Sequence, residues 1–241
     1  MKTIDPDELL LAYRLGVFPM AETRDAQEVL WVRPSMRCVI PINNFHVPKR
    51  LARTVRGDRF DIRCDTAFDR VIRNCAKAGP QRDESWINPA ITQVFEELHR
   101  RGHAHSIETW AGNELVGGLY GLSLGAAFFG ESMFSIETDA SKVALVHLVA
   151  RLKCGGYRLL DAQFPNPHLE QFGAVDIPEA AFEKLLQDAT AGSANFYSMD
   201  GCGSASPSGE ITSSENGSSS DNGSTSSGGG ASVLQLITQT S

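Results

Sequence analysis

The sequence predicts an α+β fold, in which helices cover a mostly antiparallel sheet. Three apolar segments separated by short turns predict an antiparallel meander, with Gly112-Asn113 as the tight turn between the first two. A strongly apolar helix over residues 140–153 and a further strand over 157–162 follow, and an antiparallel sheet combined with helices is typical of the α+β class. The three meander segments are residues 104–110, 114–120 and 126–133.

The first 45 residues are predicted to form a small N-terminal domain built from short elements. A helix over residues 7–15 would be capped by Asp5 or Asp7 and end at Gly16. The other elements expected here are an apolar turn at residues 18–20 and strands at 30–32 and 38–40.

Residues 46–196 are predicted to form the main domain. It begins with a basic helix over residues 46–56 and ends with a helix over residues 178–190. Besides the meander, the helix and the strand described above, this domain should contain a strand over residues 60–64, an amphipathic helix over 66–78 and a helix over 89–101.

Residues 197–241 are predicted to form a disordered, flexible tail. Residues 201–231 consist almost entirely of Gly, Ser, Asn, Thr, Asp and Glu. Such a segment cannot bury enough apolar area to offset the entropy lost on ordering. The apolar residues 233–237 end the tail, and we expect them to dock weakly at most.

The charge distribution indicates a polyanionic partner. The formal net charge of the chain is −7. Residues 45–82 nevertheless contain ten Lys or Arg and four Asp, which gives a local charge of 10 − 4 = +6. A basic face on an acidic protein can steer a polyanion to one place. The alternative is an ordinary solvated surface of mixed charge.

The cysteines and the apolar runs indicate a cytoplasmic protein that does not enter a membrane. The five cysteines are odd in number and form no CxxC pair, which favours reduced thiols over a disulfide framework. Their spacing also differs from that of zinc ligands. No apolar run approaches the ~20 residues that a membrane helix needs. The start of the chain shows no apolar signal-peptide region.

Glycine is concentrated in residues 117–130, beside the carboxylate of Glu131. Apolar strands rarely need glycine, so the pattern predicts a backbone that other groups approach closely. A lone acid in such surroundings is costly to bury without a partner. Together these features predict a cleft that accepts an apolar group beside a positively charged one.

Six sequence blocks, in one order along the chain, resemble the bacterial leucyl/phenylalanyl-tRNA–protein transferases. The most specific block contains Phe129-Gly130-Glu131-Ser132-Met133-Phe134-Ser135. Several blocks in the same order are far more specific than one short motif. The six blocks are residues 10–20, 85–87, 104–110, 117–135, 140–142 and 160–163.

The resemblance implies a GNAT-like acyltransferase domain and an aminoacyltransferase activity. Members of the family move Leu or Phe from aminoacyl-tRNA to the α-amine of proteins that begin with Arg or Lys. Because an apolar pocket discriminates only weakly between similar side chains, we expect Met to be a poor donor as well. This transfer marks the acceptor for degradation by the N-end rule. Because the aminoacyl ester is already activated, we expect no cofactor and no metal. Family members are usually monomeric.

The predicted catalytic residues are Asp161, Gln163 and Glu131. Residues two apart on a strand point to the same face, so Asp161 could polarise the carboxamide of Gln163. The Gln163 carbonyl would then accept a hydrogen bond from the attacking amine. Glu131 would pair with the positive charge of the acceptor. The structural alternatives are a strand-ending Asp–Gln pair and a salt bridge between Glu131 and Lys142.

Two further groups of residues are expected to bind the donor. Five apolar residues are candidates for the amino-acid pocket, and ordinary core packing is the alternative for each: Leu119, Phe128, Met133, Leu145 and Leu152. Seven residues are candidates for tRNA binding, with the tryptophans stacking on adenine and the cations contacting phosphates: Trp31, Arg37, Trp86, Lys49, Arg50, Arg53 and Arg56.

The N-terminal block departs from the family where Val32 and Ser35 replace the usual Trp and Asp. This departure places the adenosine contacts of the region in question. Two other functions remain open, a GNAT-type acyl-CoA N-acyltransferase and a non-catalytic tRNA-binding protein. The first predicts a glycine-rich loop opening a helix, and residues 135–142 contain no glycine. The second gives no reason for Glu131, Asp161 and Gln163 to occur together.

Overall fold

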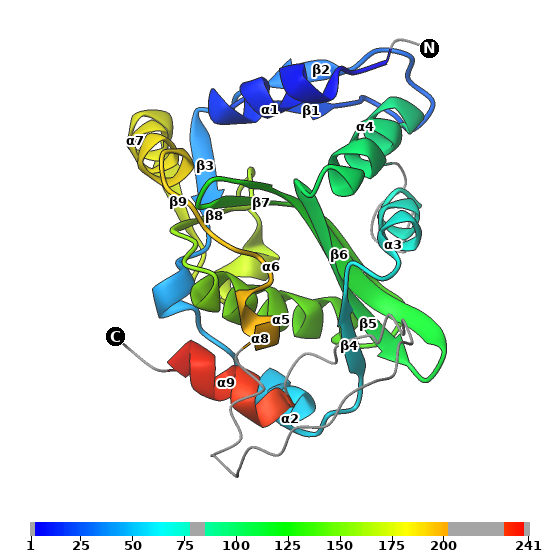
Figure 1. Cartoon of the computed structure of the whole chain (residues 1–241), viewed down its shortest axis with the longest axis vertical. Helices are drawn as coiled ribbons and strands as arrows, with labels where there is room; N and C mark the ends of the chain where they lie inside the picture. Colours follow the sequence, from blue (N-terminus) through cyan, green and yellow to red (C-terminus); the bar gives the residue numbers. More distant parts are fainter. Residues whose placement is uncertain (1–2, 78–84, 202–228, 239–241) are drawn as a thin grey trace, which may run out of the picture.

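A seven-stranded mixed sheet forms the centre of the protein (Figure 1). The structure is a computed structural model that describes residues 3–77, 85–201 and 229–238. The strand order is β4-β5-β6-β7-β8-β3-β9; β7 and β8 run parallel, and the other neighbouring strands run antiparallel. The predicted combination of helices and a sheet is confirmed. The strands are β3 (Met36–Val39), β4 (Asp61–Cys64), β5 (Ala104–Ala111), β6 (Glu114–Leu124), β7 (Ala127–Ser135), β8 (Leu159–Asp161) and β9 (Val175–Pro178).

The predicted meander is confirmed as strands β5, β6 and β7. Its two turns contain Gly112 and Gly125, with φ of +59° and +61°, a region in which glycine meets no steric penalty. Strand β6 extends closer to its turn with β7 than predicted, because Leu124 still pairs with Ala127.

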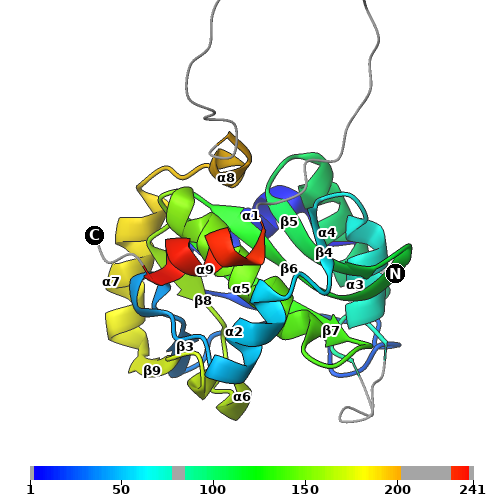
Figure 2. The same ribbon diagram turned by 90° about the horizontal axis from the view of Figure 1, so that it is seen from below.

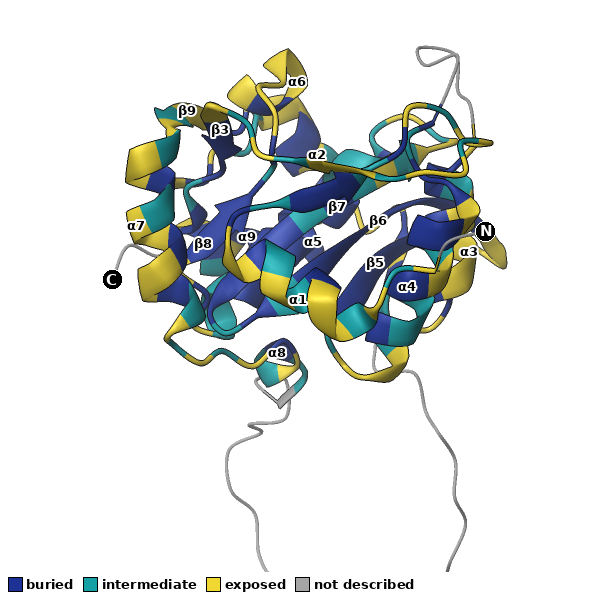
Figure 3. Ribbon diagram, turned by 90° about the horizontal axis from the view of Figure 1, so that it is seen from above, coloured by how far each residue is buried: buried dark blue, intermediate teal, exposed yellow. Residues whose placement is uncertain are grey.

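Helices cover both faces of the sheet, and alternate residues of β6 divide between them. Leu119 packs with the long helix α5 on one face, whereas Tyr120 and Leu122 pack with helices α3 and α4 on the other. Helix α1 also lies over the second face. Figure 3 shows the strands between these layers as buried. The helices are α1 (Pro6–Arg14), α3 (Phe68–Cys75), α4 (Pro89–Arg100) and α5 (Ala140–Cys154).

The glycines of β6 mark close approaches, as predicted, and the approaching groups belong to the protein. A Cβ added to Gly117 would lie 2.5 Å from the Cβ of Ala140 on α5. A Cβ added to Gly118 would lie 2.8 Å from the carbonyl oxygen of Ile107. These positions let helix α5 and strand β5 pack directly against the β6 backbone.

The N-terminal region contains helix α1, capped by Asp5, and a separate two-stranded sheet. The apolar turn predicted at residues 18–20 is corrected: these residues form strand β1 (Phe18–Met20), which pairs antiparallel with β2 (Leu30–Val32). The next strand, β3, leaves this region and lies between β8 and β9 in the large sheet. The domain boundary at residue 45 stays a prediction.

The helices predicted at residues 46–56 and 178–190 agree in position with the structure and differ at their ends, whereas α8 (Ser198–Gly201) falls within residues 197–241, which were predicted to be a disordered tail. The basic helix begins at Lys49 rather than at His46. Pro48 is the N-cap residue, and a proline disfavours helical dihedrals at the residue before it, which is Val47. No helix among the described residues is long and apolar enough to cross a membrane. The other elements are α2 (Lys49–Arg56), η1 (Ile42–Asn44), α6 (Pro167–Glu170), α7 (Glu179–Thr190) and α8 (Ser198–Gly201).

The tail predicted to be flexible ends in an ordered helix, α9 (Gly230–Thr238), which corrects the expectation for these residues. Figure 2 shows α9 beside α2 and α5. Val233, Leu234 and Ile237 are buried there, at the spacing of one apolar helix face. A Cβ on Gly230 would overlap the carbonyl oxygen of Val55 at 1.8 Å, so the helix start is pressed onto α2. Residues 202–228 and 239–241 lie outside the described residues.

Candidate active site

The candidate active site lies where the parallel strands β7 and β8 stop pairing. The last pair is Phe129 with Asp161, and beyond it Glu131 follows on β7 while Gln163 follows the end of β8. The side-chain amide of Gln163 donates from Nε2 to Oε1 of Glu131 over 3.2 Å. Both residues are buried, with exposed fractions of 6% for Gln163 and 9% for Glu131. Two of the three predicted catalytic residues therefore meet directly.

Glu131 is the extra residue of a β-bulge. On strand β6 the consecutive residues Tyr120 and Gly121 pair with Ser132 and Gly130 of β7, which leaves Glu131 without an opposite residue. A bulge increases the local twist and changes the direction of a side chain. This irregularity explains why Glu131 reaches across the space between β7 and β8.

The backbone at Gln163 adopts the left-handed region, with φ of +60°. The N–H of Phe164 donates to the carbonyl of Ala162 over 2.8 Å, which closes a three-residue turn centred on Gln163. This conformation costs an L-residue on the order of 1–2 kcal/mol. It is held on both sides, because the Gln163 N–H donates to Oδ1 of Asp161 (2.9 Å) and the Gln163 carbonyl accepts from the Cys38 N–H (3.2 Å).

Asp161 is fully buried, and both of its oxygens accept from Arg37 on β3. Nε of Arg37 lies 3.0 Å from Oδ1, and Nη2 lies 2.6 Å from Oδ2. Burial raises the pKa of Asp161, and the Arg37 guanidinium opposes that rise. The predicted contact between the Asp161 carboxylate and the Gln163 side chain is corrected. Asp161 holds the Gln163 backbone, and Glu131 holds the carboxamide.

Arg37 lies inside the protein, where tRNA cannot reach it. Its exposed fraction is 1%, and its Nη1 donates to the Gly16 carbonyl over 2.9 Å. The guanidinium lies between two aromatic rings, 4.8 Å from the centroid of Phe18 and 4.4 Å from that of Phe182. The predicted tRNA contact of Arg37 is therefore corrected, because all three guanidinium nitrogens donate to groups inside the protein.

Glu131 has a strongly shifted titration. Burial raises its pKa to about 8, and the nearby Asp161 charge adds to the rise, whereas Tyr13 and Arg37 oppose it. The buried Tyr13 hydroxyl faces Glu131 closely enough for each group to shift the other's pKa, although the hydroxyl falls short of hydrogen-bond geometry. A carboxyl group with this pKa is close to half-ionised at the pH at which an α-amine loses its proton.

Four of the five residues predicted for the amino-acid pocket lie in the core on the α5 side of the sheet: Leu119, Phe128, Leu145 and Leu152. The fifth, Met133, pairs with Leu119 across β6 and β7 and is 37% exposed. Side chains of paired residues share one face of a sheet, so Met133 continues this apolar group towards the surface.

The residues predicted to bind tRNA are spread over three regions. Trp31 on β2 is half-exposed, and Trp86 is partly buried against the core before α4. Four cations form an exposed row on α2 while the apolar side of that helix is buried. This basic row consists of Lys49, Arg50, Arg53 and Arg56.

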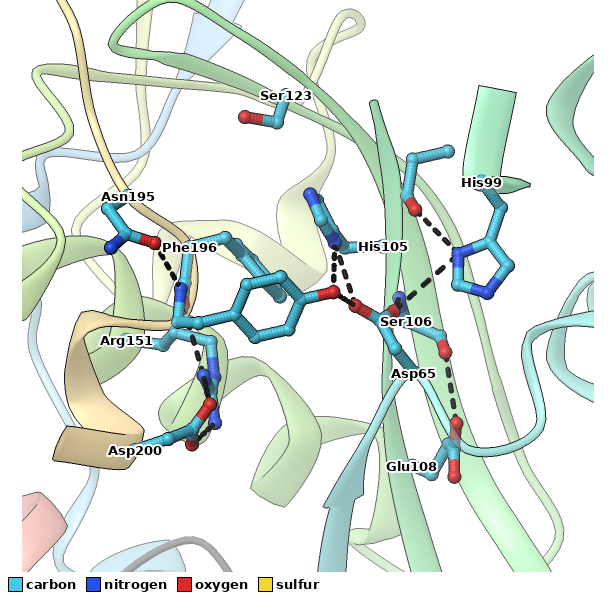
Figure 4. A network of polar contacts seen from close by, with 12 residues as sticks. Asp65, His99, His105, Ser106, Glu108, Ser123, Arg151, Asn195, Phe196 and Asp200 are labelled. Carbon is cyan, nitrogen blue, oxygen red and sulfur yellow. Dashed lines mark hydrogen bonds and ion pairs between the residues drawn. The ribbon is translucent and has the colours of Figure 1, made fainter. Parts of the chain in front are cut away.

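A second polar cluster secures the segment that leads to the tail (Figure 4). Oδ2 of Asp65 lies 2.6 Å from the Tyr197 hydroxyl and 2.8 Å from Nδ1 of His105. Arg151 binds Asp200 through Nη2 over 2.6 Å. These contacts hold residues 197–200 against the body of the protein and give His105 a structural partner. Among the described residues, no cluster of three His, Cys, Asp or Glu side chains could hold a metal ion.

Sequence reasoning missed Tyr13 and the true position of Arg37. Tyr13 lies within the first family block, and its place next to Glu131 depends on how α1 crosses the sheet. Arg37 keeps its place in the family motif and was predicted to contact tRNA, but its burial depends on β3 joining β8. Only the tertiary arrangement shows either relationship.

The site holds a fixed carboxamide beside a carboxylate, at the point where two strands of a mixed sheet separate. The family comparison assigns the chain to the aminoacyltransferases. A family model described as "Leucyl/phenylalanyl-tRNA protein transferase" matches residues 39–187, and the model of the N-terminal domain of the same family matches residues 2–35. The chain belongs to the leucyl/phenylalanyl-tRNA–protein transferase family.

Curated relatives agree with this assignment. A leucyl/phenylalanyl-tRNA–protein transferase of Paramagnetospirillum magneticum is 59% identical over 196 residues, which cover 81% of this chain and 94% of the relative. That of Phenylobacterium zucineum is 52% identical over all 241 residues, covering both chains completely. That of Caulobacter vibrioides is 55% identical over 193 residues, covering 80% of this chain and 89% of the relative.

Proposed function

We propose that this protein transfers Leu or Phe, and Met weakly, from aminoacyl-tRNA to the α-amine of proteins that begin with Arg or Lys. Family membership supports the reaction class. The observation that carries the chemistry is the hydrogen bond between Gln163 and Glu131. Because Nε2 of Gln163 is held by the carboxylate, its Oε1 is left to accept from an incoming amine.

The reaction forms an amide bond between the α-amine nitrogen and the carbonyl carbon of the aminoacyl ester, and breaks the ester bond to the ribose. The Gln163 carbonyl aligns the neutral amine by accepting one N–H. The amine proton passes to the departing ribose oxygen. Asp161 is not the final acceptor of that proton, because Arg37 already occupies both of its oxygens. Holding amine and ester together can contribute about 7–11 kcal/mol in favourable cases.

Glu131 has a second role towards the acceptor. One carboxylate oxygen holds the Gln163 amide, and the other is available to the side-chain cation of an N-terminal Arg or Lys. A cation placed there would favour the ionised form of Glu131 and lower its raised pKa. Binding of the correct acceptor would therefore charge the group that recognises it.

The donor would lie along the apolar group that ends at Met133. Its aminoacyl side chain would reach the predicted pocket residues, and the basic row of α2 would contact tRNA phosphates without reading sequence. Trp86 and Trp31 are the candidates for stacking on the terminal adenine. We propose that the protein acts as a monomer in the cytoplasm.

The main domain is proposed to be GNAT-like. The support is the parallel β7–β8 pair, which separates beyond Asp161 and is joined by the crossover helix α5. The alternative function, an acyl-CoA N-acyltransferase, has less support. Residues 135–139, which lead into α5, contain no glycine that could let a pyrophosphate approach the helix.

A transfer assay tests the proposed function. Leu-tRNA carrying labelled leucine is mixed with the protein and a peptide that begins with Arg, without ATP or CoA. We expect label to appear in the peptide, and Glu131→Ala and Gln163→Ala to slow its appearance strongly while tRNA binding stays. Tight tRNA binding without transfer by the wild type would instead favour a non-catalytic protein, and consumption of acetyl-CoA would favour the acyl-CoA enzyme.

A further inference from the structure

We propose that Arg37 is a positioning residue that acts through Asp161 to keep the Gln163 carboxamide aimed at the attacking amine. This inference rests on the proposed function, and it gives Arg37 a different role from the tRNA contact that the sequence predicts. Three contacts lead from Arg37 to the carboxamide: the guanidinium to Asp161, Asp161 to the Gln163 backbone, and the Gln163 turn to Glu131.

The first contact is rigid because Arg37 is fixed from several elements. The guanidinium donates to Gly16 after α1, lies between Phe18 of β1 and Phe182 of α7, and is 1% exposed. Its own strand, β3, pairs with β8, which carries Asp161. A planar guanidinium in such surroundings has one orientation available.

The second contact transmits that orientation to Asp161. The fork of Arg37 reaches both oxygens of the carboxylate, at 3.0 Å and 2.6 Å. This bidentate geometry fixes the plane of the carboxylate as well as its position. Oδ1 is thereby held 2.9 Å from the Gln163 N–H.

The third contact links the backbone of Gln163 to the direction of its side chain. Gln163 is an L-residue in the left-handed region, where only its neighbours keep it. If the bond from Asp161 is loosened, the turn can relax to a negative φ, and the Cβ of Gln163 then points elsewhere. The 3.2 Å bond from its amide to Glu131 would be lost.

Lysine cannot replace arginine in this arrangement. A lysine ammonium would supply the charge that Asp161 needs, but it is a point donor on a flexible stem and lacks the planar fork. Arg37→Lys therefore separates charge compensation from orientation. Arg33→Lys is the matched control, because Arg33 lies on the same segment and pairs with Glu179 and Glu183 on the protein surface.

The kinetic test is single-turnover leucine transfer by Arg37→Lys at saturating Leu-tRNA and Arg-peptide. We expect the transfer rate to fall by about 10- to 100-fold, as for a reacting group moved by about 1 Å. The Kd for Leu-tRNA should stay within about twofold of the wild type, because Arg37 does not reach the RNA. Arg33→Lys should change neither quantity.

An NMR readout tests the positioning without any transfer. In protein labelled with ¹⁵N-glutamine, the side-chain NH₂ signals of Gln163 are assigned by their absence in Gln163→Glu. We expect them displaced from random-coil positions in the wild type and in Arg33→Lys, and returned towards random coil in Arg37→Lys. If the wild type fails to transfer leucine, the proposed function is wrong. The NMR measurement still tests the role of Arg37 in that case, because it needs no transfer.

Two results would overturn the inference. One is an Arg37→Lys protein that keeps the wild-type Gln163 signals and transfer rate. The other is weaker tRNA binding with an unchanged rate at saturation, which would return Arg37 to the RNA contact predicted from the sequence. Thermal unfolding of each variant shows whether a slow protein is folded at the assay temperature.

Discussion

At the scale of single residues, the buried carboxyl group of Glu131 lowers the stability of the folded protein and is placed to take part in the proposed reaction. Burial is the largest cause of its raised pKa, so ionising this side chain works against the folded state. The folded protein binds more protons at Glu131 than the unfolded chain does between the ordinary glutamate pKa and about 8. Glu131 therefore lowers stability progressively as the pH rises through that window.

Replacing Glu131 with Gln should stabilise the protein at high pH. The amide keeps an oxygen for Nε2 of Gln163 and carries no charge. We expect the Tm of Glu131→Gln to exceed that of the wild type at pH 9 by roughly 2–4 °C per kcal/mol gained, and the difference to shrink towards pH 5. Glu114→Gln, at an exposed position on β6, should show no such trend. A difference that does not depend on pH would argue against a buried, ionising Glu131.

The pH dependence of acceptor use should report two ionisations. Below pH 7, both the α-amine and Glu131 must lose a proton before reaction, since their pKa values are ~7.7–8.0 and about 8. The slope of log(kcat/KM) for an Arg-peptide against pH should approach about two in the wild type and about one in Glu131→Gln. Equal slopes in the two proteins would mean that Glu131 need not be ionised.

At the scale of secondary-structure elements, α9 supports the rest of the molecule. Its apolar face closes the core over α2 and α5, and Lys153 donates to the Ile237 carbonyl over 3.2 Å. The buried ring nitrogen Nδ1 of His147 on α5 finds no hydrogen-bond partner within the part of the chain that the structure describes, and burial lowers the pKa of this histidine to about 4. A neutral His147 suits the dry packing of this region.

Leu234→Asp should therefore destabilise the protein by releasing α9. Placing a carboxylate at this buried position removes the apolar contact, and we expect the Tm to fall by roughly 3–10 °C. The matched control is Gln235→Asp, which adds the same charge at an exposed position of the same helix. If the two variants unfold at the same temperature, α9 is not docked in solution.

Elements with a strong local signal were predictable, and those fixed by distant partners were not. The meander and α5 follow from glycine turns and apolar periodicity, which lie within the segment itself. The sequence predicts a turn at β1 because the strand character of these residues comes from pairing with β2. The apolar run of α9 is too short to predict a docked helix, and the helices that stabilise it, α2 and α5, lie far earlier in the chain. Lys153 of α5, for example, lies 84 residues before its partner Ile237.

The candidate site was predictable in its members but not in its connections. The family blocks give Glu131, Asp161 and Gln163, and the structure brings them together. The hydrogen bonds between them depend on a β-bulge and on a left-handed turn, and neither leaves a clear sequence signal at a Glu or a Gln. The role of Arg37 depends on β3 joining a strand that lies over 100 residues later.

At the scale of the whole molecule, charge is separated so that an acidic protein can bind RNA. The net charge is −7, yet the basic row of α2 points to solvent. Each phosphate contact that we propose for that row would release condensed counterions and so add to the salt dependence of binding. Arg53→Ala should weaken tRNA binding and reduce the slope of log Kd against log salt by about one.

Arg100→Ala is the control for that measurement, since Arg100 is an exposed cation on α4, away from the basic row. It should leave the slope unchanged. If Arg53→Ala and Arg100→Ala behave alike, then the protein is steered by its overall field, and the basic row is not the tRNA-binding surface.

The coupling between Glu131 and Gln163 is the central claim, and a double-mutant cycle tests it most directly. Single-turnover leucine transfer is measured at saturating Arg-peptide, so that the acceptor-binding role of Glu131 does not enter the rate, for the wild type, Glu131→Ala, Gln163→Ala and the double variant. Because the carboxylate acts by holding the carboxamide, the double variant should be about as slow as the slower single variant. Rates that fall by the product of the two single effects would show that the two side chains act independently and would contradict the mechanism.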